Sequence, residues 1–239
     1  MIDAKRRLIV ALDVRTVDEA RGLIAALGES VAYYKIGPWL LYAKGIEGLI
    51  DLVLGSGKEL FLDCKMYDIG ETVREGVARA AERGVSLVTV HGNRDILLAA
   101  NEGKRGSELK VFAISVLTSL DDDDMREMGY LRPVEELVEV RVRKAMEYGC
   151  DGLIAAPADA PRIRAIAPPE RLLLGTPGVR PAGHGRDDHK RGGTPADAIG
   201  AGADYIVMGR PIVRADDPAS VARAVTAEMQ TAFDKREEC

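Results

Sequence analysis

The sequence predicts an α/β protein with the single-domain (β/α)8 barrel fold, also called the TIM barrel. Eight short apolar segments recur along the chain, several segments between them have helical periodicity, and glycine marks three junctions that lead from a helix into a strand. Alternation of this kind is typical of a parallel sheet covered by helices. A doubly wound open sheet is the alternative, because it has the same alternation.

The apolar segments are short, nearly continuous and rich in β-branched residues. Such segments are typical of parallel strands that are buried on both faces. In chain order they are residues 8–12, 31–36, 60–62, 87–90, 111–117, 152–156, 172–175 and 205–208. Eight strands are the number that closes this barrel.

Helical periodicity is clearest in four segments, where apolar residues recur at steps of three and four. These are residues 16–27, 71–83, 133–148 and 218–233. The first contains Thr16 followed three residues later by Glu19, a pattern that predicts a capping box. Glycines stand where a helix would end before the next strand, a position that favours glycine. They are Gly84, Gly149 and, at the third junction, Gly200 and Gly202.

Composition indicates one folded domain over residues 1–239. The chain is 46% hydrophobic and 30% charged, and no change in composition marks a linker. A chain of this length can bury one large core. We expect the residues from about 233 to 239, which end in Lys235-Arg236-Glu237-Glu238-Cys239, to form a frayed tail.

The charge pattern argues against nucleic-acid and membrane partners. The formal net charge is −5 at pH 7, and acidic and basic residues are interspersed without a basic tract. No apolar run approaches the roughly 18 residues that suggest a membrane span. The apolar run before Asp13 is too short for a secretory signal and instead predicts a first strand.

Cysteine usage indicates a reducing compartment. Cys64, Cys150 and Cys239 lie far apart in the chain, and no two of them form a C-x-x-C pair. This arrangement argues against a disulfide framework and a structural zinc site. We therefore expect a cytoplasmic protein.

The charged segment after the third apolar run is the strongest functional signal. Active sites of these barrels lie where the strands end. Asp63 and Lys65 are two residues apart, so on a strand both side chains point to one face. With Lys35 and Asp68 they predict a chain of alternating charge that needs no metal. A purely structural ion pair at the barrel end is the alternative.

The pattern Asp63-x-Lys65-x-x-Asp68-Ile69-x-x-Thr72 resembles the signature of the orotidine 5'-monophosphate (OMP) decarboxylase family. Further motifs resemble that family in the same order along the chain, and the fifth of them is closest to its bacterial-type branch. They are Ala11-Leu12-Asp13, Lys35-Ile36-Gly37, Val90-His91-Gly92, Val116-Leu117-Thr118-Ser119, Thr176-Pro177-Gly178-Val179-Arg180-Pro181 and Met208-Gly209-Arg210-Pro211.

The resemblance implies conversion of OMP to UMP and CO₂ without any cofactor. It makes Lys65 the acid that protonates C6 of the pyrimidine and places Asp63 near the substrate carboxylate. It further implies that Lys35 holds Asp63 and the ribose, and that Asp13 binds a ribose hydroxyl. A fixed ammonium group suits this chemistry, because negative charge develops at C6 in the transition state.

The resemblance also implies a homodimer with shared active sites. The partner subunit supplies the residues that match Asp68 and Thr72, and Ile69 between them belongs to the same substrate-binding segment. Thr118 matches the position that contacts the pyrimidine.

At the other end of the substrate, Arg180, Gly209 and Arg210 match the phosphate site. They follow the seventh and eighth strands, which often bind phosphate in these barrels. His189 stands where bacterial-type members usually have a glutamine, and we include it as a substrate contact. A histidine can donate one hydrogen bond there, but it does not reproduce an amide that donates and accepts across the phosphate and the base.

Two other functions compete with this interpretation. A metal-dependent sister enzyme, such as 3-keto-gulonate 6-phosphate decarboxylase or hexulose-phosphate synthase, shares the Asp-x-Lys-x-x-Asp pattern. Those enzymes usually have an acidic residue where Lys35 stands, so Lys35 argues against them. A non-catalytic nucleotide-binding barrel is the second alternative, and the presence of all four charged residues argues against it.

Overall fold

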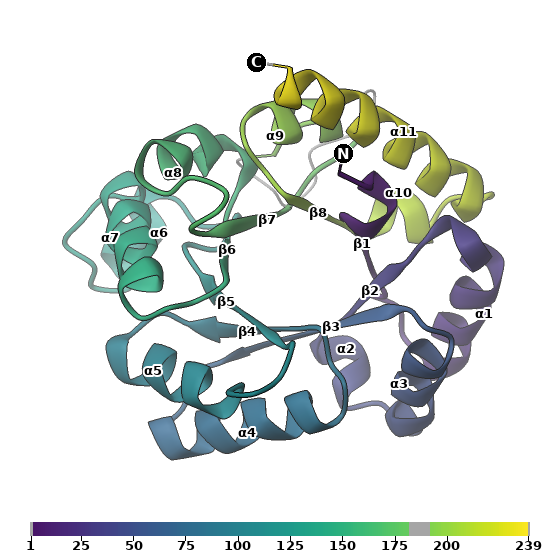
Figure 1. Ribbon diagram of the computed structural model, residues 1–239, viewed down its shortest axis with the longest axis horizontal. Coiled ribbons are helices and arrows are strands. Elements are labelled where there is room, and N and C mark those ends of the chain that lie inside the picture. The colour runs from purple at the N-terminus through teal and green to yellow at the C-terminus, as the bar shows by residue number, and fades with distance from the viewer. Residues whose placement is uncertain (1, 182–191, 239) are drawn as a thin grey trace.

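A computed structural model describes residues 2–181 and 192–238 and shows a closed barrel of eight parallel strands (Figure 1). The strands follow one another around the barrel in chain order, and β1 pairs with β8. This pairing confirms the (β/α)8 fold and excludes the open sheet. The strands are β1 (Leu8–Ala11), β2 (Tyr33–Ile36), β3 (Glu59–Met66), β4 (Leu87–His91), β5 (Lys110–Ile114), β6 (Gly152–Ile154), β7 (Leu173–Pro177) and β8 (Tyr205–Met208).

Helices surround the strands on the outside of the barrel (Figure 1). They are α1 (Val17–Leu27), α2 (Pro38–Leu41), α3 (Ile46–Gly55), α4 (Gly70–Glu82), α5 (Arg94–Gly103), α6 (Asp122–Glu127), α7 (Val134–Glu147), α8 (Ala160–Ile166), α9 (Pro195–Gly200), α10 (Arg210–Val213) and α11 (Pro218–Glu237). Short 3-10 helices span Ala4–Arg6, Gly28–Ser30 and Pro157–Asp159. The four helices predicted from periodicity are α1, α4, α7 and α11.

Side chains fill the barrel interior, so the ring of strands in Figure 1 is a packed core. Alternate residues of the strands point inward, and the residues between them pack against the helices. The inward group includes Ile9, Tyr33, Phe61, Leu87, Phe112, Tyr205 and Val207. Gly152 on β6 gives the Phe112 ring its space, because a Cβ there would lie 2.4 Å from a ring carbon.

Thr16 caps α1, although the predicted capping box is only half formed. The backbone N–H of Glu19 donates to the Thr16 hydroxyl at 3.1 Å. The Glu19 carboxylate does not return to Thr16 and instead accepts from the backbone N–H of Arg15 at 2.9 Å. The start of α1 is therefore fixed by Thr16, with Glu19 stabilising the turn before it.

The prediction of a frayed tail from about residue 233 is wrong. Helix α11 continues to Glu237, and the Phe233 side chain is buried in the core. Arg236 donates to the carbonyl oxygen of Ala203 at 2.7 Å. Lys235 and Glu237 are exposed on this docked helix, whereas Arg236 points back to the barrel. Sequence composition alone does not distinguish such a helix end from a tail.

A buried ion cluster lies at the end of the barrel where the strands begin. Asp204, just before β8, accepts from the N–H of Leu174 at 2.8 Å and forms ion pairs with Arg164 and Arg236. Arg164 also donates to the carbonyl oxygens of Gly202 and Leu172, at 2.8 and 2.7 Å. These contacts tie α8 and α11 to the start of the β7–β8 pair.

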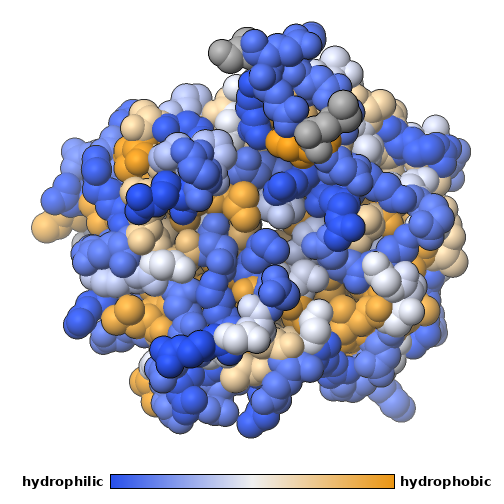
Figure 2. All heavy atoms as spheres, viewed as in Figure 1, coloured by the Kyte–Doolittle hydropathy of each residue, from blue (hydrophilic) through white to orange (hydrophobic). Residues whose placement is uncertain are grey.

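The surface is predominantly polar. Figure 2 shows a face on which hydrophilic residues dominate and hydrophobic residues form separate areas between them. Within residues 2–181 and 192–238, no helix has the length and apolar character needed to cross a membrane.

Candidate active site

A pocket of about 370 Å³ lies at the end of the barrel where the strands finish. Residues from the ends of seven different strands, or from the loops just after them, line it. They are Ala11, Asp13, Lys35, Phe61, Asp63, Lys65, Ile114, Val116, Leu117, Thr118, Ser119, Ile154, Ala155, Pro177, Gly178, Arg180, Val207, Gly209 and Arg210. The location agrees with the one that the barrel fold predicts.

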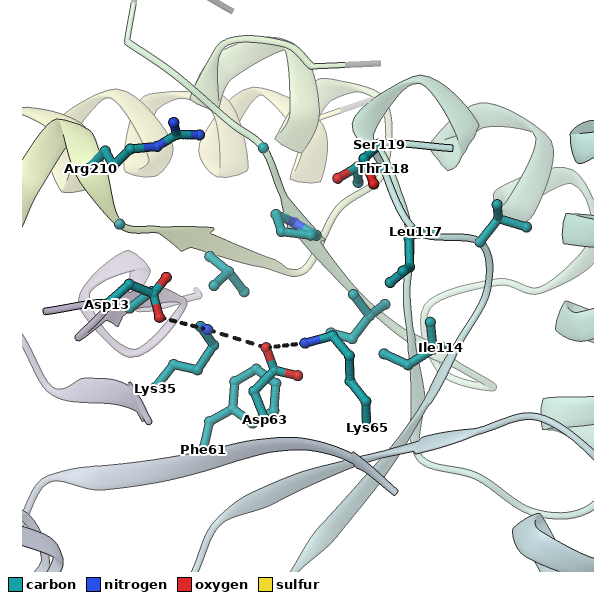
Figure 3. Close-up of a pocket in the computed structure, with 18 of the residues that line it drawn as sticks. Asp13, Lys35, Phe61, Asp63, Lys65, Ile114, Leu117, Thr118, Ser119 and Arg210 are labelled. Atoms are coloured by element: carbon teal, nitrogen blue, oxygen red, sulfur yellow. Dashed lines mark hydrogen bonds and ion pairs between the residues drawn. The ribbon is translucent and has the colours of Figure 1, made fainter. Parts of the chain in front are cut away.

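Four charged side chains form a chain of alternating sign along one side of the pocket (Figure 3). Lys35 Nζ lies 3.3 Å from Asp13 Oδ1 and 3.2 Å from Asp63 Oδ2. Lys65 Nζ lies 2.9 Å from the same Oδ2 of Asp63. Asp63 thus lies between two ammonium groups, and Asp13 forms the end of the chain within one subunit.

The mutual attraction of these groups outweighs the effect of their burial on the pKa values. Burial alone lowers the pKa of Lys35, but the charges of Asp63 and Asp13 reverse this, so that its pKa is raised. Burial alone raises the pKa of Asp63, but Lys35, Lys65 and the Thr89 hydroxyl bring it below its ordinary value. Both groups are therefore charged at neutral pH.

A bulge in β3 positions Lys65. Leu62 pairs with Val88 and Met66 with Val90, so the three residues 63–65 of β3 face a single residue of β4, Thr89. Lys65 has φ +46°, and among the described residues it alone has a positive φ without being glycine. Such a conformation costs on the order of 1–3 kcal/mol and is concentrated at functional sites. The sequence prediction that both Asp63 and Lys65 point into one site holds, but the strand between them is irregular.

Thr89 is a residue of this site that sequence reasoning missed. Its hydroxyl donates to Asp63 Oδ1 at 2.9 Å and accepts from the backbone N–H of Lys65 at 3.0 Å. The side chain is fully buried. In the sequence it stands within an apolar run, where threonine is an ordinary strand residue, and no local signal separates it from the others.

Two arginines lie at the phosphate end predicted by the resemblance. Arg210 is the first residue of α10 and lies on the side of the pocket away from Lys65 (Figure 3). Arg180 follows β7, lines the same pocket and is largely buried. Gly209 also lines the pocket, and a Cβ on it would lie 3.5 Å from Asp13 Oδ2. His189 lies outside the described residues.

The loop after β5 brings polar and apolar side chains to the pocket. Thr118 lines it, as predicted, and is mostly buried. Its neighbour Ser119 also lines it and is more exposed, so it is a second hydroxyl that the sequence-based list omitted. Ile114 and Leu117 lie on the Lys65 side (Figure 3) and lower the local polarity there.

The residues predicted to serve a neighbouring subunit lie outside the pocket of their own subunit. Asp68, Ile69 and Thr72 are exposed, and none of them lines the pocket. Asp68 Oδ1 accepts from the backbone N–H of Ile69 at 2.7 Å. Thr72 lies in the first turn of α4. Within one subunit, therefore, the chain of charges ends at Lys65.

The described part of the chain contains no group of three or more His, Cys, Asp or Glu side chains arranged to hold a metal ion. At the pocket, Asp13 and Asp63 each lie against Lys35, and Asp63 lies against Lys65 as well.

Comparison with known proteins identifies the family. Residues 6–225 match the family described as Orotidine 5'-phosphate decarboxylase / HUMPS family. The chain belongs to this family. The match spans all eight strands and both ends of the pocket, and it confirms the resemblance inferred from the Asp63–Thr72 pattern.

Relatives with established names resemble the chain over nearly its whole length. It is 50% identical over 228 residues to the orotidine 5'-phosphate decarboxylase of Afipia carboxidovorans, covering 95% of this chain and 96% of that protein. It is 48% identical over 229 residues to the protein of the same name from Methylobacterium nodulans, with 95% and 96% covered.

A solved structure has the same fold. The crystal structure of orotidine 5'-phosphate decarboxylase from Lactobacillus acidophilus superposes with a TM-score of 0.82 at 32% identity, covering 94% of this chain and 99% of that chain. The decarboxylase name is common to these three relatives, so the comparisons do not favour the sister enzymes of the family.

Proposed function

We propose that this protein is an OMP decarboxylase, which converts OMP to UMP and CO₂ in pyrimidine biosynthesis. The observation that carries the proposal is the position of Asp63 between the ammonium groups of Lys35 and Lys65. Arg180 and Arg210 line the same pocket, and Arg210 lies on the side away from Lys65 (Figure 3). A nucleotide fits this division, with its phosphate at the arginines and its base near Lys65.

Lys65 provides the chemistry at the base. When the C6–carboxylate bond breaks, its electron pair stays on C6, and the carboxylate leaves as CO₂. The Lys65 ammonium stabilises this developing charge and then donates its proton to C6, which completes UMP. Asp63 holds the Lys65 ammonium in position at 2.9 Å.

Other residues orient the nucleotide. Asp13 and Lys35 meet the ribose hydroxyls, and Thr118 contacts the pyrimidine. Arg180, Gly209 and Arg210 hold the phosphate, because guanidinium groups match its oxygens and glycine permits close backbone approach. We include His189 as a further contact to the substrate. Binding energy gained at the phosphate then serves the reaction at C6.

The reaction as proposed uses no metal and no organic cofactor. Support comes from the lysines, which provide the positive charge at the point where negative charge develops. The test follows the loss of OMP absorbance with and without EDTA. We expect equal rates in both. Activity that EDTA abolishes and Mg²⁺ restores, with turnover of 3-keto-gulonate 6-phosphate, would instead establish the metal-dependent sister enzyme.

The active form is proposed to be a homodimer that shares its sites. Asp68 is exposed and flanked by two exposed apolar side chains, Tyr67 at 73% and Ile69 at 72%. Exposed apolar residues around a carboxylate favour burial against another protein surface. A second copy of the chain would bring its Asp68 to Lys65, extending the chain of charges, and its Ile69 and Thr72 to the substrate.

Mixing two inactive variants tests the shared site. Lys65→Ala removes a residue of its own site, whereas Asp68→Ala removes one from the neighbour's site. In a mixed dimer one site carries both defects and the other neither, so activity returns to about one functional site per mixed dimer. If Asp68 acted on its own Lys65, every site would keep one defect. Mixed dimers identified by native mass spectrometry but without turnover would refute the shared site.

We further propose a cytoplasmic location. Cys64 and Cys150 are free thiols, as expected in a reducing compartment. Burial raises the pKa of Cys64 to about 11 and that of Cys150 to about 12, which keeps both protonated and unreactive.

A further inference from the structure

Thr89 faces the irregular part of β3. Residues 63–65 of that strand have no regular partners on β4, and Thr89 is the one β4 residue between the regular pairs on either side. Its side chain is 0% exposed. It does not line the pocket, so it cannot contact the substrate directly.

The Thr89 hydroxyl replaces the missing contacts of the bulge. It accepts a hydrogen bond from the backbone N–H of Lys65 at 3.0 Å and donates its own proton to Asp63 Oδ1 at 2.9 Å. The other oxygen of Asp63 is thereby left to Lys35 and Lys65. One hydroxyl thus fixes the backbone of the proposed acid and the orientation of the carboxylate beside it.

This contact matters because the backbone of Lys65 is not in a relaxed conformation. A positive φ at a residue with a side chain persists only where the surroundings enforce it. The χ1 angle of a β-branched threonine is restricted, which limits the directions its hydroxyl can take.

We propose that Thr89 is a positioning residue for the decarboxylation, which holds Lys65 and Asp63 in their reactive geometry through its hydroxyl. The proposal rests on the function proposed above. It predicts that kcat falls when the hydroxyl of residue 89 is removed, even if the volume of the side chain is kept.

The test compares Thr89→Val, which keeps the shape and removes the hydroxyl, with Thr89→Ser, which keeps the hydroxyl. For Thr89→Val we expect kcat to fall about 10- to 100-fold, the usual effect of losing a hydrogen bond to a charged group. KM should change less than about threefold, because the phosphate end is intact. Thr89→Ser should recover most of the loss.

Thr176→Val is the matched control. Thr176 is also a fully buried barrel threonine, on β7, and within the described residues its hydroxyl donates only to the carbonyl oxygen of Tyr205, at 3.4 Å. We expect kcat to stay within about threefold of the parent, since no charged partner is lost.

A second measurement tests the contact without using OMP. Amide hydrogen exchange at Lys65 should accelerate in Thr89→Val and not in Thr89→Ser, because the N–H loses its acceptor only in the former. Unchanged exchange at Lys65 in Thr89→Val would overturn the proposal. So would a kcat within about threefold of the parent, or equal losses in the valine and serine variants. If the two variants show the expected exchange pattern but the parent enzyme does not turn over OMP, the proposed function is overturned instead.

Discussion

The two ends of the barrel each bury an aspartate between two cations, but they use it differently. At the end where the strands begin, Asp204 accepts from a backbone N–H and pairs with Arg164 and Arg236. At the end where they finish, Asp63 pairs with Lys35 and Lys65 at the wall of a pocket. The two clusters have the same arrangement of charges. They differ in what the cations contact with the N–H groups that are not used on the aspartate.

Arginine and lysine explain this difference. The planar guanidinium of Arg164 uses its donors on fixed carbonyl oxygens and on Asp204, so it joins segments of the chain. A lysine ammonium is a compact charge with three donors. Lys65 meets Asp63 with one of them, and its side chain remains 34% exposed toward the pocket. The first cluster therefore stabilises the fold, whereas the second can act on a ligand.

Removing Lys65 should give the largest loss of activity. For Lys65→Ala we expect kcat/KM to fall by at least about 10⁴-fold, because both charge stabilisation and the proton donor disappear. The melting temperature should change little, since the side chain is partly exposed. The assay is loss of OMP absorbance together with a thermal melt. A variant that unfolds at much lower temperature would mean that this cluster, too, is mainly structural.

Removing Arg164 should have the opposite effect, a loss of stability without a loss of kcat. Arg164→Ala leaves Asp204 with one weak ion pair at 3.4 Å, and breaking a buried pair typically costs about 3–5 kcal/mol of unfolding free energy. The kcat of the folded protein should be unchanged. The measurement is urea unfolding, with the exposed Arg162→Ala as a control that removes only surface ion pairs. Loss of kcat in the folded Arg164 variant would contradict the separation of roles.

Removing Arg210 should weaken the binding of substrate. For Arg210→Ala we expect kcat/KM to fall about 10- to 100-fold through a higher KM, as one charge-assisted contact to phosphate is lost. Turnover falls as well if phosphate binding helps to drive the reaction. The parent enzyme should therefore process a phosphate-free nucleoside faster when phosphite is added. If phosphite gives no stimulation, phosphate binding at Arg210 does not contribute to the reaction at C6.

The barrel could be predicted from the sequence because its strands are buried on both faces and therefore have continuous apolar runs. The end of β3 could not, because Asp63 and Lys65 interrupt the apolar pattern although they belong to the strand. Short helices such as α2 and α10 have too few residues for periodicity to identify them. Interior hydrophobicity thus determines the scaffold, and the pattern fails where the strands carry function.

The residues of the candidate site could be predicted where charged side chains stand in segments that are otherwise apolar. Lys35, Asp63 and Lys65 stand out because charged residues at strand ends inside a barrel need a reason. Thr89 does not stand out, because its role depends on a bulge in the neighbouring strand that no local pattern reveals. The role proposed for Asp68 depends on a second subunit, and within one chain its side chain is exposed.

Lowering the pH should give the smallest effect, a change in the contribution of Asp63 to the unfolding free energy. The folded-state pKa of Asp63 lies below its ordinary value, through Lys35, Lys65 and Thr89 acting against burial. Its contribution to stability is therefore fully present above the unfolded-state pKa, about 3.9, and is lost as the pH falls through the lower folded-state pKa. We expect the difference in unfolding free energy between the parent and Asp63→Asn to be constant from pH 7 to about 5 and to shrink below about 4. Urea unfolding of both proteins across this range measures it, and a difference that shrinks already between pH 7 and 5 would mean that the lysines do not hold Asp63 in its charged form.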